Sequence, residues 1–286
     1  MRVGFIGMGL MGIPMSKNIL EKGFELTVYN RTKEKTKELF DLGAKVVDSP
    51  MDLTRVVDVV ITMVTAGRDL ELILFGDNGV VNGANEGLIV VDMSTIGPSF
   101  AKNIALKLSQ KRIDFIDAPV TGSTPKAITG NLTIFIGGDE KIYEKIKSIL
   151  ASIGNNLQYM GPIGCGQAIK LINNHLIATS IESLAEGMLL ADAMGLSRKK
   201  VSDVLKTSPA MSEFMNLKIF NFVTDDFPLL FSVSNMMKDL LLANKEAKKN
   251  SIKLPMLDKI VDIYRKVIKK GLGDRDMSII IDLLKK

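Results

Sequence analysis

The sequence of 286 residues has very few residues of the types that form disulfides or bind transition metals. It contains one cysteine, Cys165, one histidine, His175, and no tryptophan. A single cysteine excludes a disulfide within the chain and is typical of a cytoplasmic protein. One cysteine and one histidine also exclude a zinc site made of the usual nitrogen and sulfur ligands, so we expect no metal.

Long hydrophobic runs and concentrated positive charge are also missing. No segment approaches the roughly 20 apolar residues that a membrane-spanning helix needs. The N-terminal run MRVGFIGMGLMG is interrupted by glycines, which is typical of a strand and turn rather than of a signal peptide. The net charge is +5, but no basic run is interleaved with aromatic residues. We therefore expect a cytoplasmic protein with no nucleic-acid partner and no membrane partner.

Apolar and amphipathic segments alternate through the first half of the chain. Runs such as VDVVITMV (57–64) and GLIVVDMS (87–94) have the composition of buried strands, and helical stretches lie between such runs. This alternation predicts βαβ units and a mostly parallel sheet that is covered on both faces. After residue 161 only helices are predicted. The sequence thus predicts a Rossmann-type α/β domain over residues 1–162, followed by an all-α domain over 163–286.

A glycine-rich turn follows the first predicted strand. Its sequence, GMGLMG, fits the pattern G-x-G-x-x-G and opens a helix, which is the context in which this pattern binds a dinucleotide. Gly7 permits the tight turn, Gly9 lets the backbone approach a pyrophosphate, and Gly12 lets the helix pack on the strand. The N–H groups of the helix N-terminus favour phosphate binding. The residues predicted to contact the cofactor here are Gly7, Met8, Gly9, Leu10, Met11 and Gly12.

The end of the second predicted strand, residues 25–30, indicates which dinucleotide is bound. NAD-binding domains usually carry an Asp or Glu at this place to hold the ribose 2′-hydroxyl. This chain has Asn30, Arg31 and Thr32 instead. Arg31 can pair with a 2′-phosphate, and the neutral neighbours can supply hydrogen bonds. We therefore expect NADP(H) to be preferred, with NAD(H) possible.

Two later strand ends should face the same crevice, because ligands bind at the carboxyl ends of parallel strands. Met63 and Val64 follow one of these strands and are expected to pack near the cofactor. Thr95 follows the next strand and is expected to form a hydrogen bond near the nicotinamide. These three residues complete the cofactor contacts that the first domain is predicted to make.

The segment GCGQAIKLINNHL (164–176) starts a helix that is apolar on nearly all sides, so we expect the helix to be buried. Lys170 and Asn174 are four residues apart and share one face of this helix. One interpretation is structural: Lys170 reaches water and Asn174 satisfies a backbone group. The other is catalytic, since reduction of a carbonyl needs a proton donor and a lysine can supply the proton. His175 points elsewhere and is expected to be a core residue.

Several motifs together resemble the β-hydroxyacid dehydrogenases, the family that includes 3-hydroxyisobutyrate dehydrogenase, tartronate semialdehyde reductase and the glyoxylate/succinic semialdehyde reductases. The resemblance covers essentially the whole chain. The motifs that carry it are VGFIGMGLMGIPMSKNI (3–19), NRT (30–32), DMST (92–95), DAPVTGS (117–123), GCGQAIKLINN (164–174) and KDLLLA (238–243).

The resemblance implies a role for residues in both domains. Lys170 matches the catalytic general acid/base of the family, and Asn174 matches its companion in the substrate site. Lys238 matches a lysine that reaches the cofactor from the helical domain. Thr95 matches a cofactor contact beside the nicotinamide.

The resemblance also implies where the substrate binds. Thr121, Gly122 and Ser123 match the loop whose backbone N–H groups bind the substrate carboxylate. Phe231 and Asp239 fall where the semialdehyde reductases have substrate-pocket residues. The loop departs from the family pattern, because Thr-Gly-Ser replaces the usual Ser-Gly-Gly. The shape or polarity of the pocket is therefore expected to differ.

The function implied is that of an NADP(H)-dependent oxidoreductase, which interconverts a small hydroxyacid and its semialdehyde or oxoacid. The substrate would be of the 3-hydroxyisobutyrate, succinic semialdehyde or glyoxylate type. We expect a homodimer or homotetramer formed through the helical domain. Imine reductases share this architecture but usually lack the lysine, and 6-phosphogluconate dehydrogenase has a larger helical domain. A non-catalytic NADP-binding interaction protein is the alternative outside the enzymes.

Overall fold

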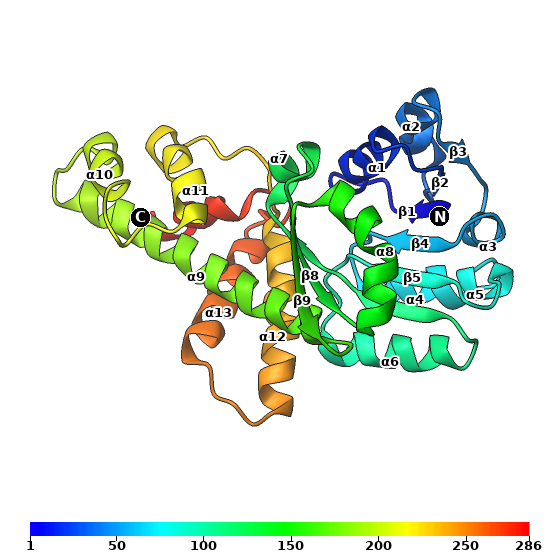
Figure 1. Ribbon diagram of the computed structural model, residues 1–286. Helices are drawn as coiled ribbons and strands as arrows, with labels where there is room; N and C mark the ends of the chain where they lie inside the picture. The colour runs from blue at the N-terminus through cyan, green and yellow to red at the C-terminus, as the bar shows by residue number, and fades with distance from the viewer. Residues whose placement is uncertain (286) are drawn as a thin grey trace. The chain divides into compact units, whose positions relative to one another are not determined.

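The computed structural model describes residues 1–285, and the chain divides into two compact units, Met1–Lys170 and Leu171–Lys286. The first unit is a sheet covered by helices, and the described part of the second consists of helices (Figure 1). The predicted fold class, a mostly parallel Rossmann-type sheet domain followed by an all-helical domain, is confirmed.

One sheet forms the centre of the first unit. Its order is β3-β2-β1-β4-β5-β6-β8-β7, and β9 pairs with β8. The pairs from β3 to β6 are parallel, as is β8 with β9, whereas β8 is antiparallel to β6 and β7. The strands are β1 (Val3–Ile6), β2 (Leu26–Tyr29), β3 (Lys45–Val46), β4 (Val59–Thr62), β5 (Ile89–Asp92), β6 (Asp114–Asp117), β7 (Val120–Thr121), β8 (Thr133–Gly137) and β9 (Asn156–Gly161).

The parallel strands end in register, so their carboxyl ends form one straight edge. Tyr29 pairs with Ile6, Ile6 with Thr62, Thr62 with Asp92, and Asp92 with Asp117. Each of these residues is the last of its strand. The loops that leave the sheet here therefore start from a common line, which is where α/β sheets bind ligands.

Helices cover both faces of the sheet because the central strands are apolar on both faces. In β4, Val59 and Ile61 pack into one core and Val60 packs into the other. The first core receives α1 (Gly12–Glu21), α2 (Lys37–Asp41), α7 (Ser123–Ile128) and α8 (Glu140–Ile153). The second receives α3 (Pro50–Thr54), α4 (Gly67–Phe75), α5 (Val80–Gly83) and α6 (Pro98–Ser109).

One predicted strand is interrupted in the structure. The apolar run IDFIDAPV (113–120) has the composition of one continuous buried strand, but β6 ends at Asp117 and β7 begins at Val120. Between them Pro119 has no N–H to donate, and the Ala118 N–H donates to the Asp92 carbonyl at 2.7 Å. The chain continues past the edge of the parallel strands, so the loop after β7 projects beyond their carboxyl ends.

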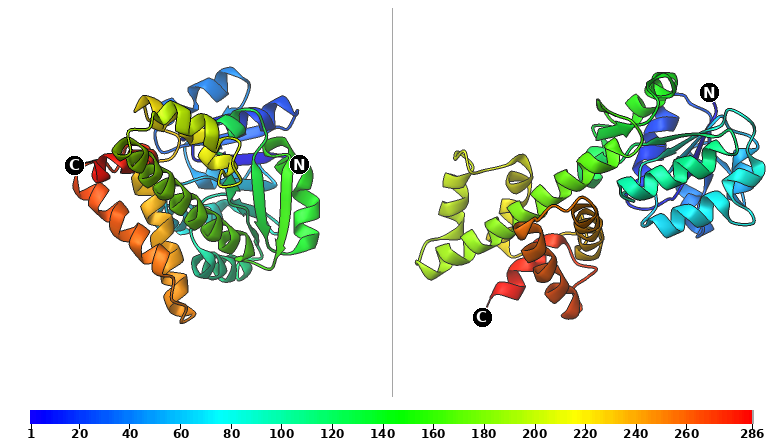
Figure 2. Two further views of the ribbon diagram at one scale, coloured as in Figure 1. Left: turned by 90° about the vertical axis from the view of Figure 1, so that its left-hand side faces the viewer. Right: turned by 90° about the horizontal axis from the view of Figure 1, so that it is seen from below.

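The second unit packs its helices around one apolar core (Figure 2). Ser232 caps α12 by accepting the Asn235 N–H, and Pro255 opens α13, which lies beside α12. The helices are the long α9 (Cys165–Ala193), whose N-terminal turns belong to the first unit, and α10 (Arg198–Leu205), α11 (Glu213–Thr224), α12 (Val233–Lys249), α13 (Pro255–Lys269) and α14 (Ile281–Leu284).

The helix α9 is not buried on all sides, as its apolar composition suggested. Ile172, Leu176 and Leu190 are exposed by 54%, 59% and 62%. The opposite face carries Ala178, Ile181 and other core residues of the second unit. The prediction of burial was wrong for one face of the helix, because composition alone does not say which elements a single chain places around it.

Candidate active site

The glycine-rich turn after β1 has the geometry that was expected at two of its three glycines, Gly7 and Gly12. Gly7 has φ +109°, and a Cβ there would overlap the Met63 carbonyl. A Cβ at Gly12 would overlap the Gly7 carbonyl oxygen. A Cβ at Gly9, by contrast, would meet no atom within 4 Å. Packing within the chain thus explains Gly7 and Gly12 but leaves Gly9 unexplained, as expected for the glycine that lets a pyrophosphate approach.

Asn30 connects this turn to the loop after β2. Its Oδ1 accepts the Met8 N–H at 2.9 Å, and its Nδ2 donates to the Thr32 carbonyl at 2.8 Å. The side chain therefore orders both loops. A carboxylate at this position could accept from Met8 but could not donate to Thr32.

Arg31 follows directly and is exposed. Its guanidinium makes no hydrogen bond or ion pair with another residue between 1 and 285. The nearby Lys33 is engaged instead, in an ion pair of 2.6 Å with Asp48. Arg31 is thus a positive charge at the end of β2 that is available to a ligand.

A buried carboxyl group organises the loops after β4 and β5. Oδ1 of Asp92 accepts from the hydroxyls of Thr62 at 2.8 Å and Ser94 at 2.7 Å. Ser94 in turn accepts the Val64 N–H at 2.9 Å. Asp92 is fully buried, and burial raises its pKa to about 7. The loops that carry the predicted contacts Met63, Val64 and Thr95 are therefore held together from below the carboxyl edge.

The start of α9 is bound to the same edge. Asp117, at the end of β6, accepts the Gly164 N–H at 2.6 Å and the Gln167 N–H at 2.8 Å. The Gln167 side chain donates to the Ser94 carbonyl at 2.8 Å and accepts the Ile96 and Gly97 N–H groups at 2.9 and 3.0 Å. Lys170 lies one turn further along α9 and is only 7% exposed.

Three of the predicted residues in the second unit form a polar cluster. Asn174 Nδ2 donates to Asp239 Oδ2 at 2.6 Å, and Lys238 Nζ forms an ion pair with Asp239 Oδ1 at 2.6 Å. Asn174 and Asp239 are buried, with 2% and 1% exposure. Phe231 is outside this cluster: its ring packs on the core of the second unit, and its N–H donates to Asp276 at 3.2 Å.

The loop Thr121-Gly122-Ser123 has an unusual backbone. Gly122 has φ +132°, and Ser123, the first residue of α7, has φ +59°. The left-handed region is costly for a residue with a Cβ, so glycine would be the less strained residue at position 123. The departure from the family pattern at Ser123 therefore occurs where the backbone favours glycine.

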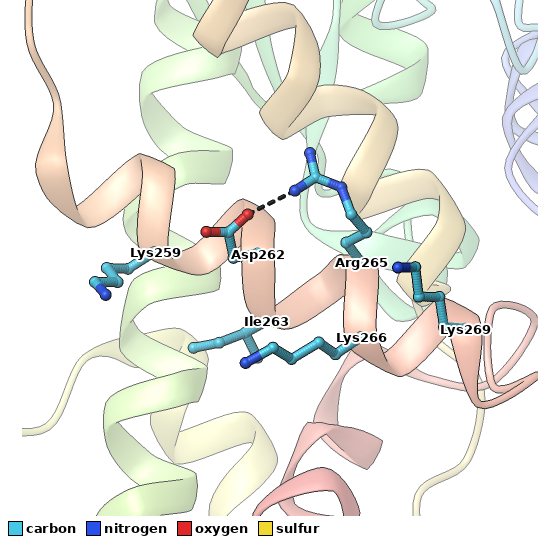
Figure 3. A pocket seen from close by; sticks show the side chains of 6 residues that line it. All are labelled: Lys259, Asp262, Ile263, Arg265, Lys266 and Lys269. Carbon is cyan, nitrogen blue, oxygen red and sulfur yellow. Dashed lines mark hydrogen bonds and ion pairs between the residues drawn. The ribbon is translucent and has the colours of Figure 1, made fainter.

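The surface of α13 has a hollow that is lined by none of the predicted site residues. Figure 3 shows one hollow on α13, lined by six residues that include the Asp262–Arg265 ion pair. The other four lining residues are Lys259, Ile263, Lys266 and Lys269. None of the six is a predicted site residue. The hollow is a basic part of the α13 surface.

Sequence reasoning missed three residues that shape the site: Asp92, Asp117 and Gln167. Each is fully buried and binds backbone groups at the carboxyl edge. A signal was present, since the two aspartates end apolar strands and Gln167 lies in the buried face of an apolar helix. Polar groups in such places need partners.

Two features are absent from the described part of the chain. No helix within residues 1–285 is both long enough and apolar enough to cross a membrane. Over the same part of the chain, no three His, Cys, Asp or Glu side chains are grouped as ligands of a metal ion would be.

The fold and the glycine-rich turn define a dinucleotide-binding protein, and comparison with known proteins agrees. Residues 2–161 match the family described as the NAD binding domain of 6-phosphogluconate dehydrogenase. Residues 164–284 match the family described as NAD-binding of NADP-dependent 3-hydroxyisobutyrate dehydrogenase. The chain belongs to the 3-hydroxyisobutyrate dehydrogenase, or β-hydroxyacid dehydrogenase, family of NAD(P)-dependent oxidoreductases, which confirms the resemblance.

Individual relatives are similar along nearly the whole of this chain. The 2-(hydroxymethyl)glutarate dehydrogenase of Eubacterium barkeri is 32% identical, over 98% of this chain and 93% of its own. The glyoxylate/succinic semialdehyde reductase 2 of Arabidopsis thaliana is 32% identical, over 99% of this chain and 79% of its own. The crystal structure of a 3-hydroxyisobutyrate dehydrogenase from Salmonella typhimurium is 26% identical, with a TM-score of 0.91 over 99% of both chains.

Proposed function

We propose that this protein uses NADP(H) to interconvert a small hydroxyacid and its semialdehyde or oxoacid, with Lys170 as the general acid in reduction. The observation that carries the proposal is the placement of Lys170. It is a buried lysine one turn beyond Gln167, whose side chain is bonded to the Ser94–Gly97 loop at the carboxyl edge. In a dinucleotide-binding unit, this is the edge at which a substrate meets the cofactor.

The chemistry requires one proton for each hydride. A nicotinamide dinucleotide, when bound, would supply the hydride for the carbonyl carbon. Lys170 donates a proton to the carbonyl oxygen, which becomes the hydroxyl of the product, and takes the proton back in the oxidative direction. Asn174 lies one turn further along α9, and its link to Asp239 orients the amide.

The preference for NADP(H) is supported by the end of β2. No carboxylate stands at residues 30–32 to repel a 2′-phosphate, and Arg31 is exposed without a protein partner in the described chain. An arginine can contact phosphate through two N–H groups at once, which gives a strong and directional interaction. NAD(H) lacks this phosphate and would gain little from Arg31.

We propose that the substrate carries a carboxylate, bound by the N–H groups of Thr121, Gly122 and Ser123. The loop lies beyond the carboxyl edge, and Lys170, which belongs to the same unit, adds positive charge. Two of the relatives are named for substrates that are carboxylic acids, glyoxylate or succinic semialdehyde and 2-(hydroxymethyl)glutarate.

We further propose that the protein is a homodimer or homotetramer assembled through its helical part. The exposed Ile172, Leu176 and Leu190 of α9 support this, because apolar surface of this kind is usually covered in an assembly.

Substitution of Lys170 by alanine tests the proposed chemistry. With NADPH and succinic semialdehyde, Lys170→Ala should lower kcat by roughly 10²–10⁴, the usual contribution of general acid catalysis. NADPH should still bind, as measured by the fluorescence of the reduced nicotinamide. Lys147→Ala, at an exposed position of α8, is the matched control and should keep full activity. Near-normal kcat in Lys170→Ala would show that the lysine is structural.

A further inference from the structure

The Gln167 side chain makes three hydrogen bonds to the loop that follows β5. It is fully buried, its Nε2 donates to the Ser94 carbonyl at 2.8 Å, and its Oε1 accepts from Ile96 and Gly97. Both N–H groups come from the chain that leads into α6, where the backbone donors of a helix start need acceptors. A buried amide can donate and accept in this way without carrying a charge.

The Gln167 backbone is held as firmly as its side chain. Its N–H donates to Asp117 Oδ2 at 2.8 Å, and the other carboxyl oxygen accepts the Gly164 N–H at 2.6 Å. The first turn of α9 is therefore tied to β6 through the backbone and to the β5 loop through Gln167. All of these contacts are within the first unit.

Lys170 is three residues beyond this attachment, which corresponds to about 4.5 Å along a helix axis. Its backbone position relative to the Ser94–Gly97 loop, which contains Thr95, is thus set by Gln167. Proton transfer depends on such placement, since a displacement of about 1 Å can lower a rate about 10²-fold.

We propose that Gln167 is a positioning residue, which sets the location of Lys170 against the β5 loop and so acts on catalysis only through that lysine. The inference rests on the proposed role of Lys170. Gln167 would affect kcat by positioning Lys170, not by contacting the substrate.

A double-mutant cycle tests the proposal. The variants are Gln167→Met, which keeps length but has no polar group, Lys170→Ala, and the two combined. With NADPH and succinic semialdehyde, Gln167→Met should lower kcat about 10- to 100-fold and change the Kd of NADPH less than about threefold. In the Lys170→Ala background the same substitution should lower kcat by less than about threefold.

Two outcomes would contradict the proposal in different ways. In the first, the kcat of the double variant is lowered by the product of the two separate reductions caused by Gln167→Met and Lys170→Ala. In that case Gln167 does not act through Lys170 and the inference is wrong, while the proposed function stands. If Lys170→Ala alone keeps near-normal kcat, the role of Lys170 is wrong and the inference fails with it.

Gln167→Glu provides a second test if the methionine variant does not fold. A protonated glutamic acid can donate to Ser94 and accept from Ile96 and Gly97, whereas a carboxylate would oppose the Ser94 carbonyl. The ratio of variant to wild-type kcat should therefore rise as pH falls from 8 to 6. A ratio that does not change with pH would overturn the proposal.

Hydrogen exchange of the free protein measures the attachment without catalysis. The amides of residues 164–170 should exchange at least about tenfold faster in Gln167→Met than in the wild type, because the turn has lost its side-chain anchor. Gln110→Met, at the exposed end of α6, is the matched control and should leave this segment unchanged. Equal protection in wild type and Gln167→Met would show that the side chain does not hold the turn.

Discussion

Glu182 and Tyr264 are buried in the core of the second unit, and neither side chain has a hydrogen-bond partner among residues 1–285. Burial raises the pKa of Glu182 to about 7, and the charge of Glu186 adds to the effect. Burial also raises the pKa of Tyr264, and so does the charge of Glu182. A carboxyl group without partners is expected to be neutral in the folded protein over much of the acidic range.

Glu182 should make the protein less stable as pH rises. The unfolded chain loses this proton near pH 4.5 and the folded chain near pH 7, so the folded state binds more protons between these values and stability falls across them. Glu182→Gln cannot ionise. Its free energy of unfolding, relative to wild type, should increase by about 2 kcal/mol from pH 5 to pH 8.

Urea unfolding at the two pH values measures this difference. Glu21→Gln is the matched control, because Glu21 is exposed at the end of α1, and its effect should be small at both pH values. If Glu182→Gln and the wild type showed the same dependence on pH, Glu182 would have to be paired in solution.

Ser123→Gly should stabilise the protein. Ser123 has φ +59°, a conformation that costs a residue with a Cβ roughly 1–2 kcal/mol, part of which is offset by the greater freedom of glycine in the unfolded chain. We expect a net gain of about 0.5–1 kcal/mol in the free energy of unfolding. Ser109→Gly, in the last turn of α6, should instead destabilise by a similar amount. A loss of stability at both positions would show that Ser123 is not strained.

Arg31→Ala should weaken NADPH binding by about tenfold or more and leave NADH binding nearly unchanged. The expected loss follows from removal of a charged hydrogen bond worth about 1.5–3 kcal/mol. Fluorescence titration with each cofactor measures it. Arg55→Ala removes an exposed arginine before β4, at the opposite end of the strands, and should affect neither cofactor. Equal losses for NADPH and NADH would refute a contact with the 2′-phosphate.

Much of the fold could be predicted because it follows from local patterns. Apolar β-branched runs and the glycine-rich turn identify the parallel sheet and its first crossover within a few residues. Short elements such as β3 (Lys45–Val46) and α5 (Val80–Gly83) were missed, since they have too few residues to show a period.

The contacts that organise the candidate site could not be predicted in the same way. Gln167 binds residues 71 and 73 positions earlier in the chain, and Asp117 binds Gly164. These pairs meet only because neighbouring strands end in register. A single sequence shows that a polar residue lies in an apolar segment, but not which backbone groups will reach it.

The proposed substrate is a small carbonyl compound that bears a carboxylate. The most direct test compares kcat/KM, with NADPH, for succinic semialdehyde, glyoxylate and methylmalonate semialdehyde against butanal and propanal. The best acid should exceed the neutral aldehydes by about 10²-fold or more, because an empty anion site forgoes roughly 3 kcal/mol of charged hydrogen bonding. Neutral aldehydes that react as efficiently as the acids would contradict the proposed carboxylate site and leave only the fold and the dinucleotide site.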